Sequence, residues 1–353
     1  MLTDLRNTGA LAGALLCSAL LITSAPASAQ VEKKDIKISL DWAFQGPQSI
    51  WTLAEAKGYF KREGLNVTID RASGSNETVT RVASGAYDFG WGDFPTMVKY
   101  DATNPGNRLM GVYMSGDNSP NAIMTIKGKG PATPKELEGR TLGSTAGSAA
   151  NAMFPLFAEK VGIDPAKVQW KMVSGALREP MLVRGEVDGV AGFVTSSFMS
   201  LVELKVPAQD IIVMNYNDYG LSQYGTTIWT KADFVAANPK TVAAVVRAYN
   251  AALKDAIADP DAAVQTLKAR DGLLNMDIEC KRLMVSLALT ATPNFEKVGL
   301  STVDETRLVN SIGEIRRVFN FKDEIPADTV FTSRFLPPVA ERMPPKLGAC
   351  KAG

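Results

Sequence analysis

The pattern of hydrophobic and polar residues over 53–98 predicts a helix, a strand, a helix, a strand and a helix, in that order. The first two helices are expected to end at Gly58 and Gly85. A helix commonly ends at a residue in the left-handed conformation, which glycine adopts without a steric penalty. The run 87–91 is short, aromatic and β-prone, which is typical of a buried parallel strand. This stretch therefore predicts an open α/β sheet.

The same joint between helix and strand recurs about a hundred residues later. The runs 82–88 and 183–188 share a valine, a helix-ending glycine and an aspartate three residues after that glycine. A short hydrophobic strand follows in both places. Any α/β protein can reuse such a joint, but we interpret the repeat as two related lobes.

The remaining hydrophobic segments complete the two lobes. Other strands are predicted at 37–40, 109–114, 122–126, 140–143, 168–173 and 211–214, with a return strand at 225–229. A basic, glycine-rich connector at 127–131 marks the first change of lobe. After the return strand, Asn238-Pro239 and Asp259-Pro260 begin alanine-rich helices.

We therefore expect an α/β fold with two lobes joined by two hinge strands and a helical C-terminal third. The first lobe is predicted to cover 30–126, the second lobe 127–225, and the return to the first lobe with the C-terminal helices and tail 226–353. Because the chain crosses twice, the lobes are expected to move about a hinge.

Residues 1–29 have the features of an export signal peptide. Arg6 precedes an apolar run at 9–22, and Ala27-Ser28-Ala29 matches a cleavage site. A retained membrane anchor needs about 18 or more apolar residues, and the apolar run at 9–22 is too short for that. We therefore expect a periplasmic protein that is exported and cleaved after Ala29.

Charge and composition exclude several classes of function. With Lys+Arg 38 against Asp+Glu 37, the net charge is +1, and no basic cluster favours nucleic acid. The chain has no histidine, which excludes Ser-His-Asp and Cys-His nucleophiles and imidazole bases. Cys280 and Cys350 remain after cleavage, and in an oxidising compartment they either form a disulfide or stay independent thiols.

Three loops at the carboxyl ends of predicted strands carry the candidate chemistry, because open α/β sheets bind ligands there. Trp42 offers a stacking face, while Gln45 and Gln48 offer hydrogen bonds to a flat polar ring. Asp93 either accepts from an N–H group or a cation, or caps the following helix. The turn 143–148 presents hydroxyl and N–H groups but lacks the ending of a P-loop. The candidate ligand-binding residues of these and nearby turns are Trp42, Gln45, Gln48, Asn76, Trp91, Gly92, Asp93, Ser144, Gly147 and Ser148.

The second lobe adds further candidates. Arg178 either holds an anion or forms an ion pair with Glu179. Phe193 and Thr195 stand at the end of the repeated strand. Tyr219 and Tyr224 stand beside the return crossing, and they either close over a ligand or pack internally.

Several motifs appear together and in order along the chain. They are GYF at 58–60, EGL at 63–65, VASG at 82–85, DFG at 88–90, LEGR at 137–140, GS at 147–148 and GEVD at 185–188. With them the chain resembles the periplasmic solute-binding proteins of ABC importers, in the branch of thiamine-pyrimidine-synthase-like proteins and taurine, alkanesulfonate and nitrate receptors. The resemblance implies a type II periplasmic binding protein fold, a small molecule enclosed between the lobes, and delivery to an ABC permease in the inner membrane.

We accordingly expect a monomeric receptor without a cofactor or catalytic activity. Asp41 and Asp93 outnumber the one basic candidate, which favours an aromatic or nitrogen-heterocyclic solute similar to a thiamine-pyrimidine precursor. One alternative is a receptor for an alkanesulfonate, nitrate or aromatic carboxylate held by Arg178 and the turn at Ser148. The other is a thiamine-pyrimidine synthase. The family's synthases consume a histidine and use pyridoxal phosphate and iron, and this chain has no histidine.

Overall fold

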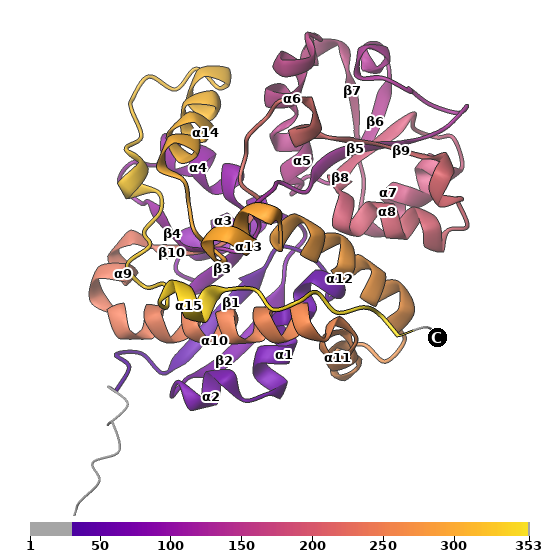
Figure 1. Ribbon diagram of the computed structural model, residues 1–353. Helices are drawn as coiled ribbons and strands as arrows, with labels where there is room; N and C mark the ends of the chain where they lie inside the picture. The colour runs from indigo at the N-terminus through magenta and orange to yellow at the C-terminus, as the bar shows by residue number, and fades with distance from the viewer. Residues whose placement is uncertain (1–29, 352–353) are drawn as a thin grey trace, which may run out of the picture.

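The computed structural model describes residues 30–351 and contains two five-stranded sheets (Figure 1). The predicted signal peptide, 1–29, lies outside the described residues. In spatial order, the first sheet consists of β2 (Asn66–Arg71), β1 (Asp35–Leu40), β3 (Phe89–Asp93), β10 (Thr226–Lys231) and β4 (Leu109–Met114). The second consists of β7 (Gln169–Met172), β6 (Thr141–Ser144), β8 (Gly189–Phe193), β5 (Asn121–Ile126) and β9 (Ile211–Asn215).

The two sheets have the same topology. In each, the first three strands run parallel, and the fourth is antiparallel to both of its neighbours. β5 therefore has the same position in the second sheet as β10 has in the first. This correspondence agrees with the interpretation of the sequence repeat as two related lobes.

The repeated glycine and aspartate have structural roles. Gly85 and Gly185 have φ angles of 78° and 74°, in the left-handed region that favours glycine. Asp88 accepts a hydrogen bond from the backbone N–H of Lys37 at 2.9 Å, and Asp188 accepts one from the N–H of Thr141 at 2.9 Å. The motif thus fixes the end of one helix to the start of the neighbouring strand in each lobe.

The predicted lobe boundary at residue 126 is wrong. The strand expected at 122–126 belongs to the second sheet, where β5 pairs with β8 and β9. The chain therefore crosses between lobes at 115–120, before this strand, and not at the connector 127–131. All residues of β5 are buried, so its hydrophobic pattern identifies a strand but not the sheet to which it belongs.

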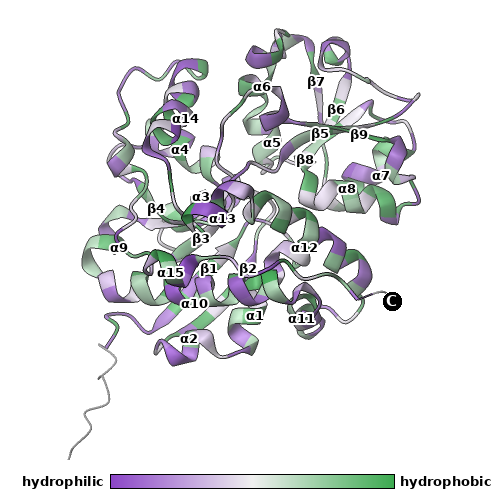
Figure 2. Cartoon of the chain, in the orientation of Figure 1, coloured by the Kyte–Doolittle hydropathy of each residue, from purple (hydrophilic) through white to green (hydrophobic). Residues whose placement is uncertain are grey.

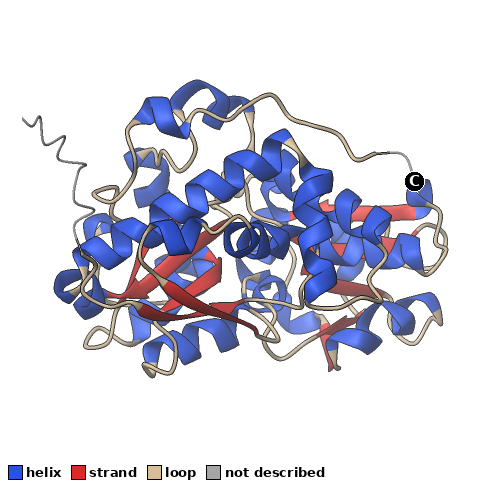
Figure 3. Cartoon of the chain, turned by 90° about the horizontal axis from the view of Figure 1, so that it is seen from below, coloured by secondary structure: helices blue, strands red, loops and turns tan. Residues whose placement is uncertain are grey.

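Helices lie on both sides of the sheets (Figure 3). Those before the second crossing are α1 (Ser49–Ala56), α2 (Tyr59–Arg62), α3 (Ser75–Ala83), α4 (Phe94–Thr103), α5 (Ala149–Ala152), α6 (Phe154–Val161), α7 (Gly175–Val183) and α8 (Val194–Glu203). Those after it are α9 (Ala232–Ala237), α10 (Pro239–Ala258), α11 (Pro260–Gln265), α12 (Met276–Thr290), α13 (Pro293–Val298), α14 (Glu305–Val318) and α15 (Val339–Arg342). Within residues 30–351, no helix is both long and apolar enough to cross a membrane.

The hydrophobic residues gather in two cores. The larger core includes the first sheet and the helices beside it, where the fully buried ring of Trp51 in α1 lies 4.6 Å from that of Tyr249 in α10. The smaller core lies between the second sheet and the helices α7 and α8, and includes Met124, Leu182 and Leu201. By contrast, α2 at the outer edge of the molecule is largely hydrophilic (Figure 2). The larger core also continues onto the second lobe, where it includes Leu142, Phe157 and Met214.

Cys280 in α12 and Cys350 near the C-terminus form a disulfide, with Cα atoms 5.9 Å apart. This is the paired alternative of the two that the sequence left open. The bridge attaches the C-terminal segment, which runs across the first lobe in Figure 1, to a helix that also contacts the second lobe.

Opening this disulfide is expected to lower the free energy of unfolding by about 2–4 kcal/mol, because the bridge restricts the unfolded chain. The variant Cys350→Ala removes the bridge without changing the buried position at Cys280. Urea unfolding of the variant and of the wild type, each with and without reductant, measures the effect. Equal unfolding midpoints for all four samples would contradict it.

Candidate functional site

A cavity lies between the lobes, at the carboxyl ends of β1, β6 and β8. Its free volume in this arrangement of the lobes is about 30 Å³, and we call it the central cavity. Its lining residues are Asp41, Trp42, Gln45, Pro47, Gln48, Gly74 and Ser75 from the first lobe, and Ser148, Ala149, Arg178, Gly192, Phe193, Thr195 and Ser196 from the second. This is the edge at which open α/β sheets bind ligands.

An adjoining cavity with a free volume of about 20 Å³ shares Asp41, Gln48 and Phe193 with the central cavity. Trp91 lines it from the end of β3, and its indole N–H donates to Ser115 at 2.8 Å. Residues of α12, including Thr290, complete its wall. The helical C-terminal third therefore contributes directly to the site, which no pattern in the sequence indicated.

The two lobes touch each other beside the central cavity. The hydroxyl of Ser196 donates to the Gln45 side chain at 2.8 Å, and the backbone N–H of Asn76 donates to the carbonyl of Gly147 at 3.3 Å. A Cβ atom on Gly147 would lie 2.7 Å from the carbonyl oxygen of Ser73, so the absence of a side chain permits this approach. The structure is thus a closed arrangement of the lobes.

Arg282 of α12 makes a second link between the lobes. It donates to the backbone carbonyl of Ser196 and, at 3.1 Å, to the hydroxyl of Ser200, both in α8. On its other side it pairs with Glu279 at 3.1 Å, and Glu279 in turn accepts the N–H of Gly46 at 2.6 Å. This chain of contacts runs from the loop after β1 to the second lobe.

Trp42 packs against Arg178 across the cavity. The guanidinium lies 5.2 Å from the centre of the indole, and a Cβ atom on Gly175 would approach the indole to 2.8 Å. Arg178 is buried and pairs with Glu179 at 2.7 Å while donating to Ser197 at 2.7 Å. Its charge is therefore balanced within the second lobe, and its role here is to support one face of Trp42.

Asp41 stands at the junction of the two cavities. Burial raises the pKa of its carboxyl to about 7, against the opposing effect of the Gln48 amide, which donates to it at 3.2 Å. The sequence shows Asp41 as an acid of this loop, but no local signal sets it apart from the other candidates there. The structure makes it the most buried ionisable group of the central cavity.

Asp93 has the structural role that the sequence gave as its alternative. It accepts from the backbone N–H and the hydroxyl of Thr96, at 2.9 and 2.6 Å, and so caps α4. It also accepts from Asn121 of β5 at 2.9 Å, which links the lobes. Burial raises the pKa of the Asp93 carboxyl to about 6. Asp93 lines neither cavity.

The predicted site residues divide into two groups. Those that line the central or the adjoining cavity are Trp42, Gln45, Gln48, Trp91, Ser148, Arg178, Phe193 and Thr195. Those that line neither cavity are Asn76, Gly92, Asp93, Ser144, Gly147, Tyr219 and Tyr224. Of this second group, Asn76 and Gly147 meet at the contact between the lobes. Gly92 packs against Trp229, and the hydroxyl of Ser144 donates to a backbone carbonyl within the second sheet.

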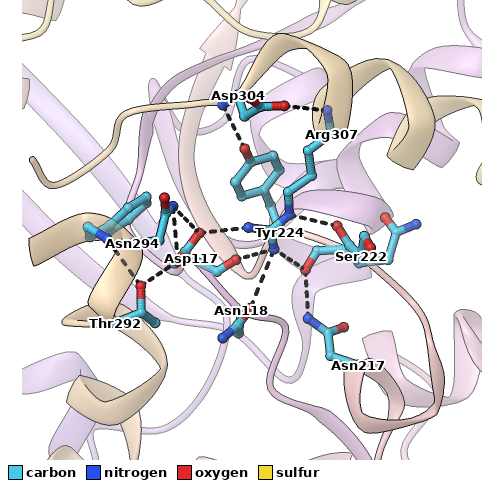
Figure 4. Close-up of polar contacts among 11 residues, drawn as sticks. Asp117, Asn118, Asn217, Ser222, Tyr224, Thr292, Asn294, Asp304 and Arg307 are labelled. Carbon is cyan, nitrogen blue, oxygen red and sulfur yellow. Dashed lines mark hydrogen bonds and ion pairs between the residues drawn. The ribbon is translucent and has the colours of Figure 1, made fainter. Parts of the chain in front are cut away.

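Tyr219 and Tyr224 have the internal packing that the sequence gave as one of their two alternatives. Tyr224 is fully buried, and its hydroxyl accepts the N–H of Asp304 at 2.8 Å (Figure 4). Its ring packs edge-on to Phe94. Tyr219 packs against Phe157, with ring centres 5.4 Å apart. Both tyrosines hold the second crossing in place, because their rings find apolar partners beside it.

Arg307 of α14 holds the two crossings together (Figure 4). Its guanidinium pairs with Asp117 of the first crossing at 2.7 Å and donates to the carbonyl of Ser222 in the second crossing at 2.9 Å. It also lies 4.0 Å from the ring centre of Tyr224. Asp117 further accepts hydrogen bonds from Thr292 and from Asn294, which flank the start of α13. The hinge is thus fixed by C-terminal residues that are remote in sequence.

The donor set of the site is mostly hydroxyl, amide and carboxyl groups. Among residues 30–351, no three Cys, Asp or Glu side chains gather into a group that could hold a metal ion. The described lining of both cavities includes no lysine. The described lining therefore offers hydrogen bonds and aromatic faces, and it includes an acid, Asp41, that forms no ion pair with a described residue.

Comparisons with known proteins agree on a family and a fold. The model of the family described as "NMT1/THI5 like" matches residues 49–263. The 4-amino-5-hydroxymethyl-2-methylpyrimidine phosphate synthase of Schizosaccharomyces pombe is 25% identical over 225 residues, which cover 61% of this chain and 63% of the synthase. The chain thus spans less than two thirds of that relative. The formylaminopyrimidine-binding protein of Halalkalibacterium halodurans is 23% identical over 264 residues, covering 73% of this chain and 78% of that protein.

A solved structure supports the same fold. The alkanesulfonate-binding protein SsuA of Xanthomonas axonopodis pv. citri, bound to MOPS, has a TM-score of 0.64 and 16% identity, covering 88% of this chain and 98% of SsuA. The fold is therefore that of a periplasmic binding protein. Because the family model matches more than half of the sequence, the chain belongs to the NMT1/THI5-like family.

Proposed function

We propose that the protein is the exported receptor of an ABC importer and captures a small aromatic or nitrogen-heterocyclic solute between its lobes. The central cavity carries this proposal, because it is enclosed by both lobes at the ligand-binding edge of each sheet. Trp42 and Phe193 supply apolar surface, and Gln45, Gln48 and Asp41 supply polar contacts. Closing the lobes around the solute gives a permease a distinct shape to recognise.

The relatives are consistent with this ligand class. One relative is named for binding a formylaminopyrimidine, and another for synthesising a pyrimidine phosphate. An anion receptor fits the site less well, because Glu179 already neutralises Arg178. The short helix α5 also offers little to an anion, since Ser148 caps it with its own side chain.

The synthase named among the relatives makes an enzyme the second candidate. The described residues do not fit the pyridoxal phosphate chemistry of such a synthase, because the two cavities present no lysine to bind the cofactor covalently. The chain also has no histidine to donate to a pyrimidine. Binding without conversion is therefore the better reading of this site.

Native mass spectrometry of freshly purified protein tests the proposal. We expect a small molecule to be retained by the native protein. Denaturing the protein is expected to release this molecule chemically unchanged. A thermal-shift screen of ring compounds is the companion measurement, since a ligand at about 100 times its Kd stabilises by roughly 2.7 kcal/mol. Turnover of any compound after addition of pyridoxal phosphate and iron would overturn the proposal of a receptor and support the alternative of an enzyme.

A further inference from the structure

Among residues 30–351, no lysine or arginine forms an ion pair with Asp41. The residue is 2% exposed and lines both cavities. Its pKa is affected by burial, by the Gln48 amide, by its own backbone and by Asp93, and by no lysine or arginine. A buried carboxylate normally pairs with a cation or accepts several hydrogen bonds. Within the described part of the chain, Asp41 accepts one side-chain hydrogen bond, from Gln48 at 3.2 Å.

Gln48 is also incompletely paired. It is 4% exposed and lines the same two cavities. Its Nε2 donates to Asp41, whereas its Oε1 is buried without a hydrogen-bond partner among the described residues. An unpaired buried acceptor destabilises a protein, because it has given up its hydrogen bonds to water without replacing them. Two neighbouring side chains at the junction of the cavities therefore present unmet acceptors, beside the second N–H of the Gln48 amide.

The groups around Asp41 add no positive charge. Asp93 faces it from the end of β3, and the phenol of Tyr249 faces it from α10. Arg178 lines the other side of the central cavity but is bound to Glu179 and Ser197. The junction is thus suited to a guest that brings its own charge. The indole of Trp42 in the same cavity favours a guest that is flat.

From these contacts we infer that the ligand is a planar cation with two adjacent N–H donors, such as an amidine or a protonated aminoheterocycle, which Asp41 and Gln48 bind together. The inference rests on the proposed function, whose cavity it uses. Each N–H donor satisfies one of the unmet acceptors, and the positive charge satisfies the buried carboxylate. A carboxylate or sulfonate ligand would instead place acceptors against acceptors.

Three compounds of nearly equal shape test this inference. Benzamidine presents two donors and a positive charge, benzamide one donor and one acceptor, and benzoate two acceptors and a negative charge. Isothermal titration of the mature protein is expected to rank their affinities in that order. Because Asp41 must be ionised to bind a cation, the affinity for benzamidine is expected to fall roughly tenfold for each pH unit below about 7.

Asp41→Asn keeps the shape of the side chain and removes the charge. It is expected to lower the affinity for benzamidine roughly tenfold to a hundredfold and to abolish the pH dependence. Asp101→Asn is the matched control. Burial also raises the pKa of the Asp101 carboxyl to about 7, but this residue accepts the N–H of Leu109 at 2.8 Å and lines neither cavity. Its variant is expected to bind benzamidine with the wild-type affinity and pH profile, and thermal melts confirm that both variants are folded.

The inference is overturned if benzoate binds as well as benzamidine, if benzamidine does not bind, or if Asp41→Asn leaves its binding unchanged. Native mass spectrometry separates this failure from failure of the proposed function. A retained solute with an anionic head group would contradict the inference of a cationic ligand but would still agree with the proposed receptor function. Turnover of a retained solute would contradict the receptor itself.

Discussion

Gly147→Ala is expected to weaken binding of the retained solute roughly tenfold to a hundredfold, by preventing the lobes from closing. The added Cβ atom would lie 2.7 Å from the carbonyl oxygen of Ser73 and 3.2 Å from the Cα atom of Gly74, both in the opposite lobe. These are backbone atoms, so they cannot rotate away as the end of a side chain would. Native mass spectrometry measures the loss of solute, and small-angle X-ray scattering measures the loss of compaction.

Gly143→Ala is the matched control for this variant. It lies in β6 of the same lobe, where a Cβ atom would meet Val187 at 3.4 Å, an ordinary contact. The φ angle of Gly147 is outside the left-handed region, so alanine adds volume there without straining the backbone. Wild-type affinity and compaction in Gly147→Ala would show that the contact between Ser73, Gly74 and Gly147 does not belong to the ligand-bound state.

Arg307→Ala is expected to lower the free energy of unfolding by about 3 kcal/mol, because it leaves the buried carboxylate of Asp117 without its cationic partner. The guanidinium also bonds to the backbone of both crossings, so its loss is expected to widen the range of lobe orientations. Urea unfolding measures the stability. Scattering of the unliganded protein measures the spread of conformations.

Two further variants define what Arg307 contributes. Arg316→Ala, on the same helix, removes an exposed arginine that lies 3.7 Å from the exposed Glu324, and is expected to change stability by less than about 0.5 kcal/mol. Arg307→Lys keeps the charge but loses the planar fork that reaches both crossings. It is expected to retain most of the stability and still loosen the hinge. If Arg307→Ala is as stable as Arg316→Ala, the hinge does not depend on this ion pair.

The elements of the fold were predictable because their signals are local. Gly58, Gly85 and Gly185 end helices through their own backbone preference, and all three have positive φ angles. The strands at the cavity end in loops rich in aromatic and amide residues, and Trp42, Gln45 and Gln48 of one such loop line the cavity. Such signals need only a few neighbouring residues to be read.

The partners of these elements were not predictable in the same way. β5 is uniformly hydrophobic, so either sheet satisfies its pattern, and its position beside β8 decides its lobe. Tyr224 suits a cavity wall or a core equally well until Arg307 and Asp304 are found next to it. The contribution of α12 to the adjoining cavity has no local signal, because it depends on where a distant helix packs.

The sequence by itself determined the alternation of helices and strands, the repeat of one lobe by the other, and the loops that carry aromatic and amide side chains. These follow from hydrophobic period, glycine conformation and helix capping, which act over a few residues. Only the tertiary structure decided which acid stays unpaired in the cavity, that Arg178 is neutralised by Glu179, and that Arg307 joins the two crossings. Burial and pairing of charge depend on groups brought together from distant parts of the chain, and those distances are set by packing.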